Sequence, residues 1–399
     1  MLEYDIAVVG GGPAGLSSAY SAASEGSKVI LFEKDDAIAH NIRTSGVSWI
    51  KEMEKLKIPR EMYNPIKNFT IISPSNEVTI KGQDFSSCVL DVRRVYQYLA
   101  MLAAEAGAKI MVRSRVLGLV LSPHGKIMLG ANTPLGNLEI KAKLVIDASG
   151  FSSFVGRKLG LVNSWKRYGV GAEYECYCDN VDVETWFLMV GKRYSDAGYA
   201  WVFPLSKNRI KIGVGVGRPE SSSDPVQKLN EILEKKLKPL NRLTNIQPLE
   251  FHFGFIPNEG SRQTTVDDGL IMVGDSAGQS NPLVLEGIRY AIEFGRLAGR
   301  VGAQSLSKES VKSALIEYER IWKNKVQSKI NSAMKIQSRW MNLSDNQWDQ
   351  EIEMLRHMSL EEFLDFIRAE FTGTKMLRLA MNHPRLAARQ LFSSVLQRG

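Results

Sequence analysis

The sequence predicts an α/β fold in three parts: a dinucleotide-binding domain, an antiparallel sheet inserted into it, and a helical C-terminal region. Three observations indicate this fold. The chain opens with an apolar segment that runs into the glycine-rich turn 10–15, residues 169–252 alternate in polarity as strands do, and the chain after Ser280 has helical spacing. With 399 residues, of which 44% are hydrophobic, the chain is long enough for one large or two ordinary domains.

The N-terminal segment has the order of a strand–helix–strand unit. Residues 4–9 form an apolar run typical of a buried strand, residues 13–24 are rich in alanine and serine and should form a helix, and residues 28–32 are a second strand. An acidic residue, Glu33, ends the second strand. This order is typical of a Rossmann-type dinucleotide-binding domain.

Three glycines in the first turn have the spacing GxGxxG. Gly10 closes the turn, Gly12 lets the backbone approach a pyrophosphate, and Gly15 lets the helix pack on the strand, so that the helix amino end faces the phosphates. Glu33 lies about 20 residues further on, where its carboxylate can accept hydrogen bonds from ribose hydroxyl groups. We therefore expect a bound dinucleotide.

The next part of the domain follows the same pattern. Residues 90–106 carry apolar residues at helical spacing and stop at Gly107, and residues 109–112 and 117–121 read as strands. Residues 144–146 form a buried strand that ends in the sequence DASG. That sequence is either a simple turn or a third element of the nucleotide site.

A late strand, residues 270–273, ends in Gly274-Asp275. Asp275 is suited to cap a helix, and its carboxylate can also reach a ribityl hydroxyl group. The helix expected after Pro282 would direct its positive end to the pyrimidine edge of a flavin and stabilise the anionic reduced ring. The dinucleotide is therefore predicted to be FAD.

Residues 169–252 alternate between apolar and polar side chains, which predicts an antiparallel sheet interrupted by a short helix at 225–237. The predicted domains are a discontinuous FAD-binding domain (1–168 with 253–300), an antiparallel-sheet substrate domain (169–252) and a helical C-terminal region (301–399).

A second glycine fingerprint would mark a separate nicotinamide domain. Gly213, Gly215 and Gly217 have GxGxG spacing, but they lie in an alternating strand with no helix after it. We interpret them as small residues on one face of a strand. We therefore expect an external reductant to bind transiently, without a dedicated binding domain in this chain. It could be a nicotinamide nucleotide, ferredoxin or a quinol.

The order of these motifs resembles the flavoprotein group that contains p-hydroxybenzoate hydroxylase, and within it the archaeal geranylgeranyl reductases. The discriminating residues are 198–204, Gly-Tyr-Ala-Trp-Val-Phe-Pro, which are similar to that family's GYxWxFP motif. The resemblance covers residues 1–300 clearly and the helical tail loosely.

The resemblance implies which residues hold the cofactor and line a tunnel for a polyprenyl chain. The FAD-binding residues it implies are Gly10, Gly12, Ala14, Gly15, Glu33, Lys34, Arg43, Thr44, Ser45, Arg93, Val116, Asp275, Gly287 and Ile288. The substrate-binding residues it implies are Tyr199, Trp201, Phe203, Leu285 and Glu286. The three aromatic residues share one face of a strand, which also fits ordinary packing against the core.

The sequence departs from the family pattern at three places. The family usually has Arg-Cys-Gly-Glu-Gly where this chain has residues 43–47, so that Thr44 replaces the cysteine and the acidic residue is missing. The family's arginine near the start of the next helix is Val92 here, with Arg93 one place later. Leu285-Glu286 is bulkier than the family's glycine-rich loop before Gly287.

The resemblance implies an FAD-dependent reductase that saturates C=C bonds of a polyprenyl, geranylgeranyl-type lipid by hydride transfer, as in archaeal membrane lipid biosynthesis. An unactivated alkene has no carbonyl group to polarise, so catalysis depends on holding it in a dry tunnel. No catalytic proton donor is identified. Glu286, turned inward, is a candidate acid, but an outward, solvated side chain is the favoured interpretation. A flavin monooxygenase on an apolar substrate, or a flavin-containing lipid-binding protein without turnover, stay open as alternatives.

The charge and the cysteines limit the possible partners. The net charge is +8, and Lys375, Arg378, Arg385, Arg389 and Arg398 lie in a tail, 371–399, without acidic residues. The tail is either a solvated helix or a contact with an anionic membrane surface. No nucleic-acid motif accompanies the charge, so a nucleic-acid partner is not expected.

No stretch is long and apolar enough to span a bilayer, and the N-terminus lacks a signal region, so we expect a cytoplasmic protein. Peripheral contact with the inner membrane face stays open for it. Cys176 and Cys178 share one strand face and are too close together for a zinc site, so no metal is expected.

Overall fold

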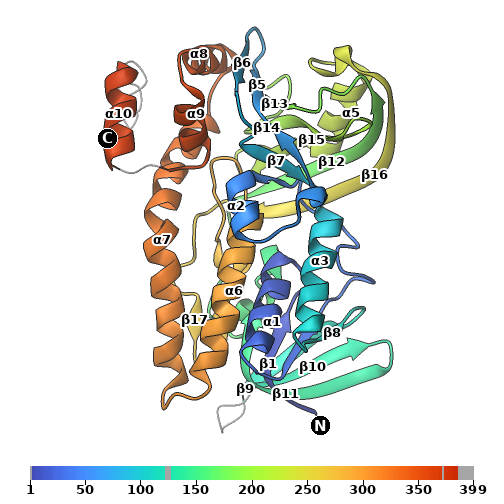
Figure 1. Ribbon diagram of the computed structural model, residues 1–399, viewed down its shortest axis with the longest axis vertical. Coiled ribbons are helices and arrows are strands. Elements are labelled where there is room, and N and C mark those ends of the chain that lie inside the picture. Colours follow the sequence, from blue (N-terminus) through green and yellow to red (C-terminus); the bar gives the residue numbers. More distant parts are fainter. Residues whose placement is uncertain (1, 122–126, 371–372, 385–399) are drawn as a thin grey trace.

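The computed structural model describes residues 2–121, 127–370 and 373–384. Two large sheets follow one another along the long axis of the molecule, and a layer of helices runs beside both of them (Figure 1). The first sheet lies at the bottom of that view, the second lies at the top right, and the C-terminal helices lie on the left. The predicted α/β architecture is thereby confirmed.

The first sheet has a parallel centre with the strand order β18-β11-β1-β2-β8. Antiparallel strands extend it, because β17 pairs with β18 while β10 pairs with both β11 and β9. The strands of this sheet are β1 (Leu2–Val9), β2 (Val29–Phe32), β8 (Lys109–Met111), β9 (Arg115–Leu121), β10 (Ile127–Thr133), β11 (Gly136–Asp147), β17 (Val266–Asp267) and β18 (Leu270–Met272).

The second sheet has seven strands in the order β16-β12-β15-β14-β13-β5-β6, and all neighbours are antiparallel except β13 and β5. Its strands are β5 (Asn68–Ile72), β6 (Glu77–Lys81), β12 (Tyr168–Asp179), β13 (Thr185–Met189), β14 (Gly198–Ser206), β15 (Arg209–Arg218) and β16 (Thr244–Pro257). Two of them, β5 and β6, come from the range 1–168 that the sequence assigned to the FAD-binding domain. The domain boundaries themselves stay a prediction.

A small third sheet has β7 in its centre, and strands β5 and β6 of the second sheet come between its strands β4 and β7 in the chain. Its strands are β3 (Val47–Trp49), β4 (Tyr63–Ile66) and β7 (Ser87–Leu90). It follows the loop 43–46, so it holds one end of that loop in place.

Most of the helices belong to two groups. Helices α1, α3 and α6 pack near one another beside the first sheet, and α7 runs along the left side of Figure 1 to α8 and α9 at the top. The helices are α1 (Pro13–Ser24), α2 (Ile50–Lys55), α3 (Val92–Glu105), α4 (Phe154–Lys158), α5 (Pro225–Glu234), α6 (Ile288–Ser305), α7 (Val311–Trp340), α8 (Asp345–Leu355), α9 (Leu360–Ile367) and α10 (Gly373–Asn382). Short 3₁₀ helices lie at Arg60–Met62, Gly150–Ser152, Leu240–Arg242 and Gly274–Ala277.

Local sequence signals explain where several helices begin. Pro13 occupies the first turn of α1, where its missing N–H costs nothing. Helices α8 and α9 begin with capping boxes built from Ser344 with Gln347 and from Ser359 with Glu362. These caps fix the two helices over the second sheet.

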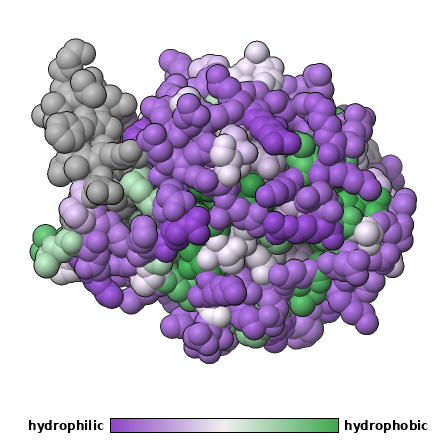
Figure 2. Space-filling model, turned by 90° about the horizontal axis from the view of Figure 1, so that it is seen from above, coloured by the Kyte–Doolittle hydropathy of each residue, from purple (hydrophilic) through white to green (hydrophobic). Residues whose placement is uncertain are grey.

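Buried hydrophobic side chains form the core, and the surface seen in Figure 2 is mainly hydrophilic. Cys176 and Cys178 lie in the same buried cluster on one side of β12, which confirms that they share a strand face. Figure 2 looks onto the end of the molecule that is uppermost in Figure 1, and this face is mainly hydrophilic with scattered hydrophobic patches. Within the described part of the chain, no group of three or more His, Cys, Asp or Glu side chains is arranged to hold a metal ion.

Candidate functional site

The glycine turn between β1 and α1 leaves room for a ligand. Gly10 has a φ of 112°, and a Cβ atom on Gly15 would lie 1.9 Å from the carbonyl oxygen of Gly10. Only glycine fits at either position. Helix α1 starts at this turn without a side-chain cap, so its first backbone N–H groups are available to phosphate oxygens.

Glu33 is held at the end of β2 by two backbone groups. Its Oε2 atom accepts a hydrogen bond of 2.7 Å from the N–H of Gly11, and its Oε1 atom accepts one of 2.8 Å from the N–H of Asp35. The carboxylate therefore lies beside the glycine turn, where a ribose would lie if the pyrophosphate occupied the turn.

Asp35 in turn organises two of the predicted cofactor residues. It accepts hydrogen bonds from Lys34 and Arg43, at 2.6 and 2.7 Å. Burial opposes ionisation of this carboxyl group, but the hydrogen bonds from Lys34, Arg43 and Asn41 outweigh it and lower the pKa of Asp35 to about 2. The loop that begins at Arg43 is thus tied to the end of β2.

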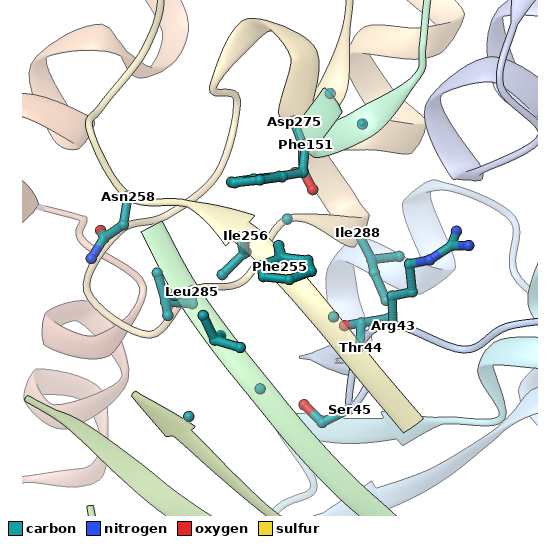
Figure 3. A pocket seen from close by; sticks show the side chains of 18 of the residues that line it. Arg43, Thr44, Ser45, Phe151, Phe255, Ile256, Asn258, Asp275, Leu285 and Ile288 are labelled. Carbon is teal, nitrogen blue, oxygen red and sulfur yellow. The ribbon is translucent and has the colours of Figure 1, made fainter. Parts of the chain in front are cut away.

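A cavity of about 750 Å³ joins the glycine turn to the second sheet. Figure 3 shows its central part: Asp275 and Phe151 lie at one end of the view, Ser45 lies at the other, and Phe255 lies between them. The predicted cofactor residues that line it are Gly10, Gly12, Ala14, Glu33, Lys34, Arg43, Thr44, Ser45, Val116, Asp275, Gly287 and Ile288.

Two predicted cofactor residues lie outside this lining. Gly15 contributes by allowing α1 to pack against the turn. The guanidinium group of Arg93 donates to the carbonyl oxygen of Ala39 and forms an ion pair with Glu250. Arg93 therefore lies between the loop 39–40 and the second sheet. The contact of Arg93 with FAD stays a prediction.

Asp275 occupies a 3₁₀ turn, and the structure does not make it a helix N-cap. Helix α6 begins only at Ile288, with Gly287 in the N-cap position. A Cβ atom on Gly287 would lie 3.5 Å from Oδ1 of Asp275, so the carboxylate and the start of α6 meet at one point of the cavity. Burial raises the pKa of Asp275 to about 6.

Replacement of Asp275 by asparagine is expected to stabilise the flavin-free protein above pH 6 by about 1–2 kcal/mol. Between pH 3.8, the ordinary pKa of an aspartate, and about pH 6, the carboxyl group of Asp275 is protonated in the folded protein and ionised in the unfolded one. Stability therefore falls as pH rises through this window, and the full cost of the buried charge is present above it. Urea unfolding at pH 4 and pH 7.5 measures this, and an equal effect of D275N at both values would contradict it.

The loop before α6 is built differently from the sequence-based expectation. Leu285 has a φ of 50°, and backbone hydrogen bonds of 2.9 and 3.3 Å close the turn between Asn281 and Glu286. The outward, solvated orientation expected for Glu286 is wrong, because its side chain is buried and accepts a 2.7 Å hydrogen bond from Nε of Arg289. The arginine three residues further on was the signal for this ion pair.

Of the predicted substrate residues, the three aromatic ones lie on β14 and the other two lie in the loop before α6. Tyr199, Trp201 and Leu285 line the large cavity, whereas Phe203 and Glu286 line a small adjacent pocket of about 60 Å³. The hydroxyl group of Tyr199 donates to the carbonyl oxygen of Val284 at 2.7 Å, which ties the aromatic strand to the loop before α6.

The glycines of β15 explain how the large indole of Trp201 is accommodated. A Cβ atom on Gly213 would lie 2.3 Å from the indole ring, and one on Gly215 would lie 3.5 Å from it. Their interpretation as small residues on one strand face is confirmed, since β15 continues as a strand and no helix follows the three glycines directly. The side chain of Trp201 lies flat against backbone on one side and faces the cavity on the other.

Two groups of lining residues were missed by sequence reasoning. Glu173 and His252 are buried polar residues on the cavity face of β12 and β16, and their only sequence signal was an inward position in an alternating strand. The C-terminal helices were predicted, but not that they wall the cavity. Their apolar lining residues are Trp340, Met341, Trp348, Ile352, Leu355, Phe363, Phe366 and Ile367.

The arrangement fits FAD. The glycine turn and the start of α1 leave room for a pyrophosphate, and the Glu33 carboxylate can bind a ribose. The cavity then continues past Asp275 to Thr44, Ser45 and Gly287. Beyond that point the lining becomes aromatic and aliphatic, which suits an apolar substrate next to the flavin ring.

Comparisons with known proteins agree with this division. Residues 5–157 match the model of the FAD dependent oxidoreductase family, and residues 168–255 match that of the geranylgeranyl reductase catalytic domain. The chain is 31% identical over 397 residues to the digeranylgeranylglycerophospholipid reductase of Methanosarcina acetivorans, with 94% of each chain covered. It is 32% identical over 359 residues to the protein of that name from Methanocaldococcus jannaschii, with 88% of this chain and 90% of the relative covered.

Solved structures show the same fold. A geranylgeranyl bacteriochlorophyll reductase-like protein from Thermoplasma acidophilum superimposes with a TM-score of 0.86 at 23% identity, covering 98% of this chain and all of the other. A flavin-dependent brominase superimposes with a TM-score of 0.66 at 18% identity, covering 92% of this chain and 93% of the other.

Proposed function

The chain belongs to the geranylgeranyl reductase family and is an FAD-dependent oxidoreductase, and from this premise we propose that it saturates C=C bonds in the geranylgeranyl chains of a glycerophospholipid. One observation carries the proposal. A single cavity joins the predicted flavin site to an aromatic strand face and to the apolar side chains of α7, α8 and α9.

The residues of the chain have three tasks in this reaction. FAD, when bound and reduced, supplies the hydride. The glycine turn, Glu33 and Asp275 hold the cofactor in the proposed arrangement, and Tyr199, Trp201 and the C-terminal helices hold the prenyl chain against it and exclude water. Because an isolated alkene offers no polar group to activate, positioning is the main catalytic contribution of these side chains.

The lipid class is proposed from the relatives, whose names specify a digeranylgeranylglycerophospholipid. The apolar wall of the cavity supports a prenyl chain as the bound part. A free prenyl diphosphate is an alternative substrate that the same wall would accept.

The test is anaerobic turnover with photoreduced holoprotein. We expect digeranylgeranyl glycerophospholipid to gain two hydrogen atoms per saturated bond by mass spectrometry, with reoxidation of the flavin in the same sample. The fully saturated lipid is the matched control and should leave the flavin reduced. Product that appears only with oxygen would indicate a monooxygenase, and bound lipid without reoxidation would indicate a binding protein. Either result would contradict the proposal.

A membrane-bound substrate also requires access to a lipid surface, and we retain peripheral contact through the tail 371–399 as a proposal. Within the described residues, no helix is long and apolar enough to cross a bilayer. Two basic residues of the tail lie near acidic partners on α9: Lys375 Nζ is 2.6 Å from Asp365, and Arg378 is 3.5 Å from Glu361. Arg385, Arg389 and Arg398 lie outside the described residues.

A further inference from the structure

A row of polar side chains leads from the cavity to the protein surface across the second sheet. Nε1 of Trp201 donates to Oε2 of Glu173 at 2.7 Å, and Oε1 of the same carboxyl group is 2.8 Å from Nδ1 of His252. Nε2 of His252 is 3.5 Å from Oε1 of Glu250. The side chain of Glu250 is 38% exposed, whereas those of Glu173 and His252 are at most 4% exposed.

The inner end of this row lies beside the predicted flavin site. Glu173, Trp201 and His252 all line the cavity. Gly254 follows His252 by two residues on the same face of β16, and a Cβ atom there would lie 2.4 Å from the carbonyl oxygen of Arg43. Residues two apart in a strand are separated by about 7 Å. The carboxyl group is therefore close to the loop 43–45 that borders the flavin position.

Among the described residues, no lysine or arginine donates a hydrogen bond to the Glu173 carboxyl group. Lys211 is a buried cation on the same face of the sheet, but its Nζ atom donates to the carbonyl oxygens of Ser45 and Leu90. Arg209 pairs with Glu175 instead. Glu173 is thus bonded to one neutral donor and to one imidazole, which is an arrangement that can pass a proton in either direction.

Three other acidic groups that line the cavity have neighbours of their own. The hydroxyl group of Tyr199 donates to a backbone carbonyl. Glu351 forms an ion pair with Arg339 on the helical wall. Asp275 lies next to Gly287, within the part of the cavity proposed for the flavin. The row through Glu173 combines a carboxyl group in the substrate part of the cavity with a route to solvent.

We propose that Glu173 is the proton donor of the reduction, and that His252 and Glu250 return a proton to it from solvent. This inference rests on the proposed reduction of an alkene. One alkene carbon accepts the hydride from reduced FAD, and the other takes the proton of Glu173, so that two C–H bonds form while the π bond, the O–H bond and the N–H bond that carried the hydride break. The electrons come from the reduced FAD, which ends oxidised. The Glu173 carboxylate then takes the proton from Nδ1 of His252 while Nε2 of the same ring takes a proton from solvent through Glu250, so that the ring loses one proton and gains one.

Replacement of Glu173 by glutamine is the first test, because the amide keeps the shape of the side chain but cannot donate an acidic proton. General acid catalysis is worth about 10²–10⁴-fold. We therefore expect reoxidation of the flavin by lipid to slow at least about 100-fold, with unchanged KM for the lipid and an unchanged rate of flavin reduction. The matched control is E175Q, two residues away on the same strand, where Glu175 binds Arg209 outside the cavity lining. It should react like the wild type.

Three further measurements separate proton delivery from a structural role. Acetate should partly restore turnover in E173A, because a small acid can occupy the vacated space. H252N, which removes the second proton-carrying nitrogen, should slow repeated turnover more than the first one. E250Q alters a partly exposed residue that also pairs with Arg93, so flavin affinity is measured beside turnover. With FAD bound, only the repeated turnovers should slow, by roughly tenfold.

A readout independent of turnover uses the protein without lipid or flavin. In ¹⁵N-labelled wild-type protein, the proton shared between Nδ1 of His252 and Oε1 of Glu173 should give a downfield signal typical of a hydrogen bond between an imidazole and a carboxyl group. E173Q should lose this signal, and E175Q should keep it. Saturation of lipid by the wild type together with undiminished reoxidation in E173Q would overturn the relay alone. A wild-type protein that leaves the lipid unsaturated would overturn the proposed function and the relay with it.

Discussion

Replacement of Gly213 by alanine is expected to lower kcat/KM for the lipid about 100-fold while FAD stays bound. The new Cβ atom would lie 2.3 Å from Cε2 and Cζ2 of Trp201, so the indole must move by about 1 Å or more. The ring cannot slide along its strand, because it packs between Tyr199 and Phe203 at centroid distances of 5.8 and 6.1 Å. It is therefore pushed into the cavity, and its hydrogen bond to Glu173 is lost.

Steady-state kinetics, flavin titration and tryptophan fluorescence measure this effect. Gly215 provides the matched control, since it lies two residues further along the same face of β15. A Cβ atom there would meet the Trp201 ring at 3.5 Å, which is an ordinary contact. G215A should lose less than about tenfold in kcat/KM. Equal kinetics for the two variants would show that the position of the indole does not control the reaction.

The sequence predicted best what depends on neighbouring residues. Helix α1 was predicted at residues 13–24 and is found at Pro13–Ser24, because the glycine turn and the proline that start it are local signals. The strands that flank it and the glycine-rich strand β15 were predicted for the same reason. The FAD-binding class followed from the order of these local elements along the chain.

Contacts between distant segments could not be read from one sequence. Glu173 and His252 are 79 residues apart, and their pairing depends on the register of β12 against β16. That register includes two irregularities, which no local pattern specifies. The strand β5 likewise joins the second sheet by parallel pairing with β13, more than 100 residues later in the chain.

The loop before α6 shows a different limit. The bulky Leu285 and Glu286 were recognised as a departure from the family pattern, but the direction of the Glu286 side chain depends on whether a partner is buried beside it. Arg289 is that partner, and it also donates to the hydroxyl group of Tyr290 at 2.9 Å. The spacing of three residues permits such a pair, but it was not predicted, and only the packing of α6 shows that the pair is buried.

Replacement of Gly299 by alanine is expected to destabilise the protein by at least about 3 kcal/mol, although alanine is favoured over glycine in a helix by about 1 kcal/mol. Gly299 lies where α6 crosses α1, and its Cβ atom would lie 2.2 Å from the carbonyl oxygen of Ser18 and 2.9 Å from the backbone nitrogen of Ala22. Backbone atoms of a packed helix cannot yield as a side chain can, so the two helices must separate. Gly302 on the same helix is the matched control, because its nearest obstacle is a side-chain atom, Cδ2 of Leu144, at 2.7 Å.

Urea denaturation should therefore show a much larger loss for G299A than for G302A, which we expect to change stability by less than about 1 kcal/mol. G299A should also weaken the binding of FAD. Helix α1 presents its amino end to the cavity, and Gly295, one turn before Gly299 on α6, packs against Ala14 of that same end with a Cβ position 2.5 Å from its carbonyl oxygen. A displaced α1 moves the backbone N–H groups proposed to bind the pyrophosphate, so G299A should release FAD more readily than G302A. Equal flavin affinity in the two variants, with stability lost only in G299A, would show that the helix contact supports the fold without positioning the cofactor.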